Sequence, residues 1–482
     1  MSQLHCQYLF GHDSKKCPYP IWEKSDSHLC LLHDPSPEKP PGLVHLLIQE
    51  KLQKKDFHFE GYIFVHPVSF REIIFEEFAN FENCQFLGKD TSFYRAQFKK
   101  GSVFNQSIFK GSRLHFSRCQ FLGNFNLFNH CQFLSEEMLW TQAEFKSKNI
   151  SFASSIWKGN QLDFRESLFQ GDVFFTQSRF EIAQLSFQKT LFDSQIVSFP
   201  QCHFQGLELD FSESRWHGGH FDFTQSLYHI GSLRFYPLLL ENKKTAFDRC
   251  QFSGNEKVFY IQNSNSELSF QGVFFQGGKT KLKGDFQNVS FIETSLDQVD
   301  LNEVHWKNLG GRLICEDEIQ AQKSGSIDDY RKAIDVCRNI KKCYEHFGVY
   351  EAAGNFYYGE MECKRKISSR KNWGGLQFMR ITSGYGEKPI RVIFTSLFLI
   401  LFCAFLYLLG GVTTPTELIQ WKPFEDSFNF IKLGRDFLHC IYFSVVCFKT
   451  LGYCDYNTTR WSRVVGAYEG FICAFFIAMF FL

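Results

Sequence analysis

The sequence predicts an all-β solenoid followed by an α-helical hairpin and by two long apolar helices that flank a shorter apolar segment. Three observations lead to this prediction. Aromatic residues, mostly Phe, recur in pairs five residues apart, about every twelve residues, between residues 81 and 291. A helical period replaces this repeat between Ser324 and Lys366. Two apolar runs, Val392–Val412 and Val464–Leu482, are each about as long as the roughly 20 residues with which a helix crosses a bilayer.

The composition limits the kind of partner. The chain has 482 residues and a formal net charge of +1, so charge gives no argument for a nucleic-acid partner. Phe is abundant, with 59 residues, which indicates a large core, a membrane part, or both. A secretory signal has a basic stretch followed by an apolar one, and the N-terminus has no such pattern. We therefore expect the long N-terminal part to lie in the cytoplasm, with its cysteines as reduced thiols or metal ligands.

Residues 1–40 hold a candidate metal site. Cys30 and His33 are separated by two residues, and Cys6 and Cys17 lie upstream. Three thiolates and one imidazole make a tetrahedral donor set that suits zinc. A short segment with few apolar residues needs such a cross-link to fold. The alternative is that these are free thiols on a flexible tail. Residues 41–80 follow as a linker or cap, which the Pro-rich stretch from Asp34 to Gly42 introduces.

The aromatic pairs define the repeat. They are Phe81/Phe86, Phe93/Phe98, Phe104/Phe109, Phe116/Phe121, Phe128/Phe133, Trp140/Phe145, Phe152/Trp157, Phe164/Phe169, Phe175/Phe180, Phe187/Phe192, Phe199/Phe204, Phe211/Trp216, Phe223/Tyr228, Phe247/Phe252 and Phe270/Phe275. A small residue, often Cys or Ser, stands two positions before the second aromatic, and an aliphatic one often stands two positions before the first. Inward residues at alternate positions of short strands, with turns between them, are typical of a β-solenoid.

Units such as Cys84–Gly88 (CQFLG) and Cys119–Gly123 (CQFLG) resemble pentapeptide repeats in their Phe-rich form. The resemblance implies a right-handed β-helix, which we expect from residue 81 to residue 310. The spacing departs from that family, because it is five then seven residues and not five then five, and this favours a wider coil. We expect two units, or about 24 residues, per coil and about eight coils with Phe ladders inside. The repeat weakens at residues 235–241 and 263–267, where we expect bulges.

Nothing in the repeat points to catalysis. Three acidic residues each precede an inward Phe, so the alternation of side chains along a strand predicts that they point outward: Asp163, Asp210 and Asp222. Parallel β-helices that cleave polysaccharides build their active sites from clustered acids of this kind. A solvated polar face explains them as well. The sequence holds no HExxH, Gly-x-Ser-x-Gly or phosphate-cradling Gly-rich motif. We therefore expect no enzyme, but a surface that assembles or binds an unknown cytoplasmic ligand or protein.

Residues 311–389 predict a helical hairpin and a juxtamembrane segment. One helix has an apolar stripe that begins at Tyr330, with Ser326 as its predicted cap and Gly348 as its end; a second helix follows. The hairpin that these two helices form is similar to the adaptor next to the pore in pentapeptide-repeat proteins that end in an ion channel. Trp373, Phe378 and Met379 are expected at the bilayer surface.

Residues 390–482 carry the most specific motif. The apolar run Phe437–Phe448 is too short to span a bilayer and leads into Thr450, Leu451, Gly452, Tyr453, Cys454 and Asp455 (TLGYCD). Non-helical backbone is tolerated at membrane depth only where protein buries it or where it lines an aqueous cavity. The segment from Asp436 to Asp455 resembles the pore loop and filter (TVGYGD) of two-transmembrane potassium channels.

The resemblance implies a homotetramer in a bilayer, because one loop cannot surround an ion. Backbone carbonyls from Thr450 to Tyr453 would coordinate potassium ions, and Asp455 would lie at the outer mouth. Lys/Arg residues before the first apolar run place that side in the cytoplasm, so we expect a multi-pass protein of the plasma or inner membrane. Glu469, inside the second apolar run, is expected to hydrogen-bond behind the pore loop.

Lys449 and Cys454 depart from the family pattern. They favour the alternative, in which the C-terminal part is a degenerate, non-conducting pore that anchors a binding or scaffold protein in the membrane.

Overall fold

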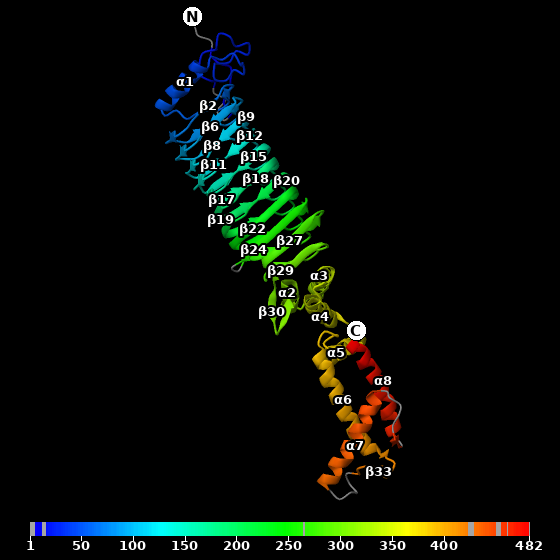
Figure 1. Ribbon diagram of the computed structural model, residues 1–482. Helices are drawn as coiled ribbons and strands as arrows, with labels where there is room; N and C mark the ends of the chain where they lie inside the picture. Colours follow the sequence, from blue (N-terminus) through cyan, green and yellow to red (C-terminus); the bar gives the residue numbers. More distant parts are fainter. Residues whose placement is uncertain are drawn as a thin grey trace. The chain divides into compact units, whose positions relative to one another are not determined.

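The computed structural model describes residues 5–11, 16–263, 266–422, 429–449, 455–459 and 461–481. They divide into two compact units, residues 1–356 (unit 1) and residues 357–482 (unit 2). Unit 1 contains helix α1 (Pro41–Gln53), the solenoid and helices α2 and α3, and helix α4 (Tyr350–Ile367) runs across the boundary. Figure 1 shows the solenoid strands stacked in sequence order from β2 toward β29.

The solenoid is one parallel sheet system of short strands among the described residues. The strands are β1 Ile63–Phe64, β2 Val68–Ser69, β3 Ile74–Phe75, β4 Ala79–Asn80, β5 Gln85–Phe86, β6 Asp90–Ser92, β7 Gln97–Phe98, β8 Ser102–Val103, β9 Ile108–His115, β10 Gln120–Phe121, β11 Phe125–Leu127, β12 Gln132–Leu139, β13 Glu144–Phe145, β14 Asn149–Ser151, β15 Ile156–Asp163, β16 Leu168–Gln170, β17 Asp172–Phe174, β18 Arg179–Ser186, β19 Leu191–Ser198, β20 His203–Asp210, β21 Arg215–Asp222, β22 Leu227–Ala246, β23 Gln251–Ser253, β24 Glu256–Asn263, β25 Glu267–Ser269, β26 Phe274–Gln276, β27 Lys279–Asp285, β28 Val289–Ser290 and β29 Val299–His305.

The strand register confirms a coil of about 24 residues. Ile63 pairs with Gln85, Gln85 with Ile108, and Ile108 with Gln132. The solenoid has about ten turns, two more than predicted, because it begins before residue 81. The segment 41–80 is therefore not a linker throughout: it contains α1 and then strands β1 to β4. The pairs Phe59/Phe64 and Phe70/Phe75 continue the repeat toward the N-terminus and were the overlooked signal.

Stacked aromatic rings fill the interior, as the sequence predicts. Neighbouring coils place equivalent rings face to face, for example Phe75 on Phe98 at 4.6 Å and Phe81 on Phe104 at 4.7 Å between ring centroids. These separations match the 4.7–4.9 Å between parallel strands, so the strand spacing itself sets the stacking distance. The rings of both pairs are fully buried. Such stacks add roughly 0.5–1.5 kcal/mol per pair beyond the burial of apolar area.

The small residue of each unit has a structural role at the corner of the coil. The residue before it has a left-handed backbone, with φ of +57° at Arg118 and at Gln142. Where the small residue is Cys, Ser or Thr, its side chain donates to the carbonyl of an aromatic residue in the preceding coil, as Cys119 Sγ does to Phe93 and Ser167 Oγ to Trp140. A larger residue would not fit at this fully buried position. This bond explains why Cys, Ser and Thr recur at this position.

The expected bulge at residues 235–241 is present, since the register of β22 with β24 shifts between Phe235 and Leu238. The second expected bulge, at residues 263–267, includes positions 264 and 265, which lie outside the described residues.

The prediction that Asp163 points into solvent is wrong. Asp163 is 1% exposed, and its carboxylate accepts from the Arg165 guanidinium and from the Arg165 backbone N–H. The chain turns at this corner, so strict alternation no longer holds, and an adjacent Arg neutralises the buried carboxylate. Asp210 and Asp222 are partly exposed and cap turns by accepting from backbone N–H groups of Ser212 and Thr224. These contacts are structural.

After the last coil come a small antiparallel hairpin, β30 (Lys307–Leu309) with β31 (Arg312–Ile314), and helices α2 (Glu316–Ser324) and α3 (Ile327–His346). Helix α2 was not predicted, because it is short and polar. Ser326 precedes α3 as predicted but makes no side-chain capping bond; Ser324 Oγ instead donates to Asp329. Gly348 has φ of +75° at the end of α3, where a stop was expected. Helix α3 packs on α2 and on strand β29.

Unit 2 is helical. It contains α5 (Arg370–Thr382), α6 (Pro389–Gly410), α7 (Phe430–Phe448) and α8 (Ser462–Phe481), together with a three-stranded antiparallel sheet of β32 (Val412–Thr413), β33 (Leu418–Ile419) and β34 (Asn457–Thr458). Helix α7 begins seven residues before the predicted apolar run Phe437–Phe448, because the Asn429 side chain caps it by accepting from the N–H groups of Ile431 and Lys432.

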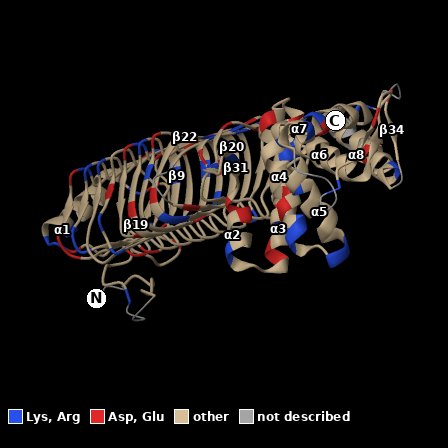
Figure 2. Ribbon diagram, turned by 90° about the horizontal axis from the view of Figure 1, so that it is seen from below, with Lys and Arg blue, Asp and Glu red and all other residues tan. Residues whose placement is uncertain are grey.

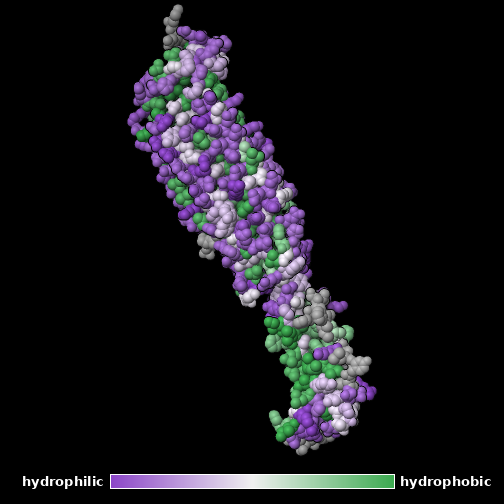
Figure 3. Space-filling model, viewed as in Figure 1, coloured by the Kyte–Doolittle hydropathy of each residue, from purple (hydrophilic) through white to green (hydrophobic). Residues whose placement is uncertain are grey.

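One helix in the described part of the chain, α6, is long and apolar enough to cross a membrane. Its outer surface exposes Ile390, Phe394, Phe398 and Phe402. Figure 3 shows the corresponding hydrophobic area, in green, on unit 2, whereas the visible face of the solenoid is mainly hydrophilic. The second predicted span falls on α8, whose side chains after Phe476 lie outside the described residues.

Candidate functional site: a Cys3His centre and a re-entrant helix

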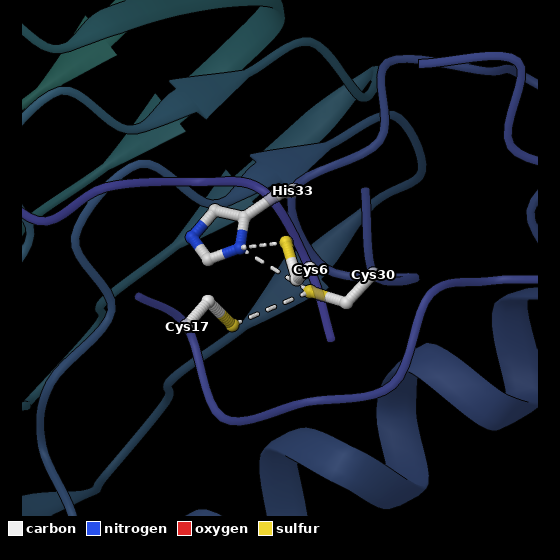
Figure 4. Close-up of side chains that lie close together, drawn as sticks. All are labelled: Cys6, Cys17, Cys30 and His33. Carbon is white, nitrogen blue, oxygen red and sulfur yellow. Dashed lines mark hydrogen bonds between the residues drawn. The ribbon is translucent and has the colours of Figure 1, made fainter. Parts of the chain in front are cut away.

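The four predicted metal ligands converge in the N-terminal segment. Figure 4 shows the side chains of Cys6, Cys17, Cys30 and His33 pointing toward one another. His33 Nδ1 lies 3.2 Å from Cys30 Sγ and 3.6 Å from Cys6 Sγ, and Cys17 Sγ lies 3.8 Å from Cys30 Sγ. All four donor atoms lie within 4.8 Å of one another, and all four residues are buried. This Cys3His group could therefore hold a metal ion such as zinc.

The first coil of the solenoid orients the imidazole. His33 Nε2 is 3.0 Å from the carbonyl of Glu60, which can only accept, so Nε2 carries the hydrogen and Nδ1 presents its lone pair to the thiols. Such a carbonyl behind a ligating histidine is the usual arrangement at metal sites. Tyr8 stacks on the imidazole at 4.0 Å between ring centroids. Sequence analysis could not find Glu60, because a backbone carbonyl has no sequence signature.

The segment is anchored to the solenoid by further bonds. Ile63 N–H of β1 donates to the carbonyl of Leu32, and the buried Lys39 ammonium donates to the carbonyl of Ile63 at 2.8 Å. Burial lowers the pKa of Lys39 to about 8. The metal group thus forms part of the cap at the N-terminal end of the solenoid.

Without a bound ion, the cysteines of the cluster favour the protonated thiol form. The hydrogen bond with Cys17, and after it burial, raises the pKa of Cys30 to about 12, and burial raises the pKa of Cys6. A bound cation reverses this preference, because it stabilises the thiolates and releases their protons.

The second candidate site is the segment around α7 in unit 2. Helix α7 starts near the C-terminal end of α6, where Arg435 faces Glu417 at 3.5 Å, and runs back along α6. Its Phe443 packs edge-on against Tyr407, and its Ser444 Oγ lies 3.1 Å from the carbonyl oxygen of Ile400. Ile400 is in the middle of α6. The C-terminal end of α7 therefore reaches about half the length of α6.

The chain then returns to the end from which α7 started. Tyr456 OH lies 2.8 Å from His439 Nδ1 of α7, and β34 pairs with β32 at the C-terminal end of α6. The distance from Ile400 to Gly410 is about 15 Å along a helix. The seven residues from 450 to 456 can cover about 25 Å when extended, so they suffice for the return. Helix α7 thus begins near the C-terminal end of α6, and the described chain that follows it lies at the same end.

A buried carboxylate joins the three helices. Glu469 of α8 is 1% exposed and accepts from the hydroxyls of Tyr407 on α6 and Ser444 on α7. The Tyr407 bond is 2.6 Å long. The predicted hydrogen bond from Glu469 to the short segment is therefore present. Tyr407 and Ser444 were not predicted as its partners, since both lie in apolar stretches that carry no other signal.

The filter motif itself falls mostly outside the described residues. Thr450, Leu451, Gly452, Tyr453 and Cys454 are not described, and Asp455 is exposed at the start of the return to β34. Of the cysteines that are described, every one except Cys447 is buried.

The solenoid surface presents charges that are largely paired between coils. Figure 2 shows charged residues of both signs along its length. Arg113 contacts Glu137 at 3.1 Å, and Lys100 contacts Glu77 at 2.6 Å, each with its partner one coil away. One hollow, of about 580 Å³, lies between the last coils and α2 and is lined by Lys244, Glu316 and Asp317 among others. Mixed charges give it no single ligand preference.

Comparison of the chain with protein-family models, curated proteins and solved structures finds no match in any of the three. The site must therefore be interpreted from its own geometry.

Proposed function

We propose that this chain is the subunit of a tetrameric cation channel, with potassium as its ion, and that the solenoid is a cytoplasmic assembly or sensing platform. The observation that supports this most is the course of α7, which descends to half the length of an apolar helix and returns within seven residues. A helix C-terminus carries about half a negative charge, so such a half-helix favours a cation at its end. In this proposal the sequence after α7, TLGYCD, would supply the backbone carbonyls that coordinate the cation.

The Glu469 network supports the same proposal. A carboxylate inside an apolar helix is costly unless it has a function or fixed partners. Here it connects α8 and α6 to the last turn of α7, and so holds the half-helix at constant depth. The exposed apolar face of α6 would contact lipid or a neighbouring subunit.

The N-terminal cluster, in this proposal, is a structural zinc site. Four protein donors complete a tetrahedron, so no position remains for substrate. Zinc would fold the first 40 residues and close the N-terminal end of the solenoid. Cys30→Ser should remove about one zinc ion per chain, as measured by elemental analysis. Full zinc content in this variant would exclude Cys30 as a ligand.

The channel is tested with the purified full-length chain in a planar bilayer under a potassium gradient. We expect single-channel current, with potassium preferred over sodium. Silence over a wide range of pH, voltage and zinc concentration would favour the alternative, a membrane-anchored scaffold.

The cysteine in the motif gives a sharper test. Most filters of this type have Gly at the position of Cys454, because a positive φ there costs a residue with a Cβ. A thiol reagent added from the outer side should change the current of the parent and leave the current of Cys454→Ser unchanged. Cys454→Gly should raise the potassium-to-sodium permeability ratio. An unchanged ratio in a variant that assembles normally would contradict this role of Cys454.

A further inference from the structure

A second group of metal-ligand side chains lies at the other end of unit 1. Cys315 precedes the first turn of α2, Glu318 lies within that turn, and Cys337 is in the middle of α3. Cys315 Sγ is 3.7 Å from Cys337 Sγ, and Cys337 Sγ is 3.9 Å from Glu318 Oε2. The three donor atoms lie within 4.8 Å of one another, and each residue is buried. No part of the proposed channel function uses this group.

The separations agree with those that a tetrahedral ion imposes. Zinc–sulfur bonds of about 2.3 Å at the tetrahedral angle separate two thiolates by about 3.8 Å. The Cys315–Cys337 separation matches this value and also matches the 3.8 Å between Cys17 and Cys30 in the Cys3His group. The two clusters therefore share their sulfur geometry, although they lie at opposite ends of the solenoid sequence.

Arg312 provides a positive charge next to the cluster. Its guanidinium donates to both oxygens of Glu318, with Nη1 3.0 Å from Oε2. Two thiolates and one carboxylate carry three negative charges, which one divalent cation and Arg312 balance. A carboxylate has about four lone-pair sites, so Glu318 can accept from Arg312 and still coordinate an ion. Carboxylates that bind a metal are usually oriented by hydrogen bonds from a neighbouring residue, and Arg312 makes such bonds to Glu318.

We propose that Cys315, Glu318 and Cys337 form a second metal site, for zinc or a divalent cation of similar softness. Binding displaces the two thiol protons to water, and the ion gains two sulfur bonds and one oxygen bond. Three protein donors leave a fourth position for water or an external donor, which distinguishes this site from the closed Cys3His centre. The ion joins α2 to α3, the helices that follow the last coil, and it should exchange more readily than the N-terminal ion.

The test is the zinc content of the full-length purified chain, measured by elemental analysis. We expect about two zinc ions per chain in the parent, about one in Cys337→Ser, about one in Cys30→Ser, and almost none in the double variant. Cys343→Ser is the matched control, because Cys343 is also buried on α3 but donates to the carbonyl of Val299, outside the cluster. The control should keep the zinc content of the parent. Equal zinc content in Cys337→Ser and Cys343→Ser would overturn the proposal.

A second measurement starts from the parent chain and follows the rate at which zinc is removed. A chromophoric chelator added to the parent should remove zinc in two phases, about one ion per chain in each, with the open site in the faster phase. Glu318→Gln should lose the faster phase and keep the slower one. A single phase that Cys30→Ser abolishes completely would overturn the second site and leave the first intact.

Discussion

The solenoid and the helical unit keep their cores together in opposite ways. In the solenoid one interaction, an aromatic ring stacked on its equivalent in the next coil, recurs in most coils, although Phe192 and Trp216 meet edge-on. In unit 2 the three long helices meet at one buried carboxylate, Glu469, which binds a hydroxyl from each of the other two. The stability of a repeat array is close to a sum over neighbouring repeats. Unit 2 has an apolar cluster that includes Leu408 and Phe443, but its Glu469 network contacts all three helices, so a change at that one residue can affect all three.

The largest expected effect is a charge placed in a ladder. Phe121 is fully buried between Phe98 and Phe145, whose ring centroids lie 5.0 and 4.7 Å away. Phe121→Asp would bury an unpaired carboxylate and remove both stacks, at a cost of several kcal/mol. Thermal unfolding followed by circular dichroism should show a large loss of stability.

Lys110→Ser is the matched control for this variant, because Lys110 is exposed on β9. We expect a change within about 0.5 kcal/mol. If Phe121→Asp unfolds at the temperature of the parent, the ladder does not carry the stability of the solenoid.

The second effect tests whether unit 2 depends on one residue. Glu469→Leu leaves the Tyr407 hydroxyl without its acceptor and removes one acceptor from Ser444, at a cost of about 1–3 kcal/mol. Glu469→Gln keeps an acceptor oxygen and should cost less. Unfolding in detergent, followed separately by a probe on each unit, should show a shift in unit 2 alone. An equal shift in the solenoid would show that the two units unfold together and that the effect of Glu469 is not confined to unit 2.

The features of unit 1 differ in how far they can be predicted from the sequence. Local spacing is enough to predict the solenoid, because every inward Phe is set by its own strand and coil. The same reasoning fails at Asp163, where a corner buries a carboxylate beside Arg165, and alternation cannot show such a pairing. The Cys3His residues were predictable from their chemistry and from the close spacing of Cys30 and His33. The approach of Cys315 to Cys337 depends on how α2 packs on α3, and no local pattern records it.

A third prediction concerns the junction between the repeat and the helices. Asp317 of α2 accepts from Ser290 Oγ and from the Phe291 N–H, and burial raises its pKa to about 6. The folded state therefore holds this proton more tightly than the unfolded chain, whose Asp pKa is about 3.9. The protonated carboxyl contributes stability below about pH 4, and this contribution is lost as pH rises through 6.

Asp317→Asn should consequently be more stable than the parent at pH 7.5, by at most about 3 kcal/mol, and should lose this advantage at pH 4. The variant-minus-parent difference in unfolding temperature, taken at each pH, removes effects common to both proteins. Asp297→Asn, at an exposed position, is the control and should show no such dependence. A constant difference across this pH range would mean that Asp317 ionises normally.

The smallest effect tests the repeat at a single corner. Cys119 Sγ donates to the Phe93 carbonyl, which also accepts from the Ala96 N–H at 2.8 Å. Removing the thiol therefore leaves that carbonyl with one partner, and Cys119→Ala should cost only about 0.5–1.5 kcal/mol. Ala96 and Ala143 already occupy equivalent corners, so the coil accommodates a methyl group there. Cys119→Ser should be nearly neutral, since Ser167 and Ser178 make the same bond to Trp140 and Phe152.

Denaturant unfolding of Cys119→Ala and Cys119→Ser measures the difference in stability between the two variants. If Ala and Ser behave alike, the corner bond contributes nothing, and the small residue is required for its size alone. If Cys119→Ala costs as much as Glu469→Leu, one corner affects many coils, and the solenoid is as cooperative as the helical unit.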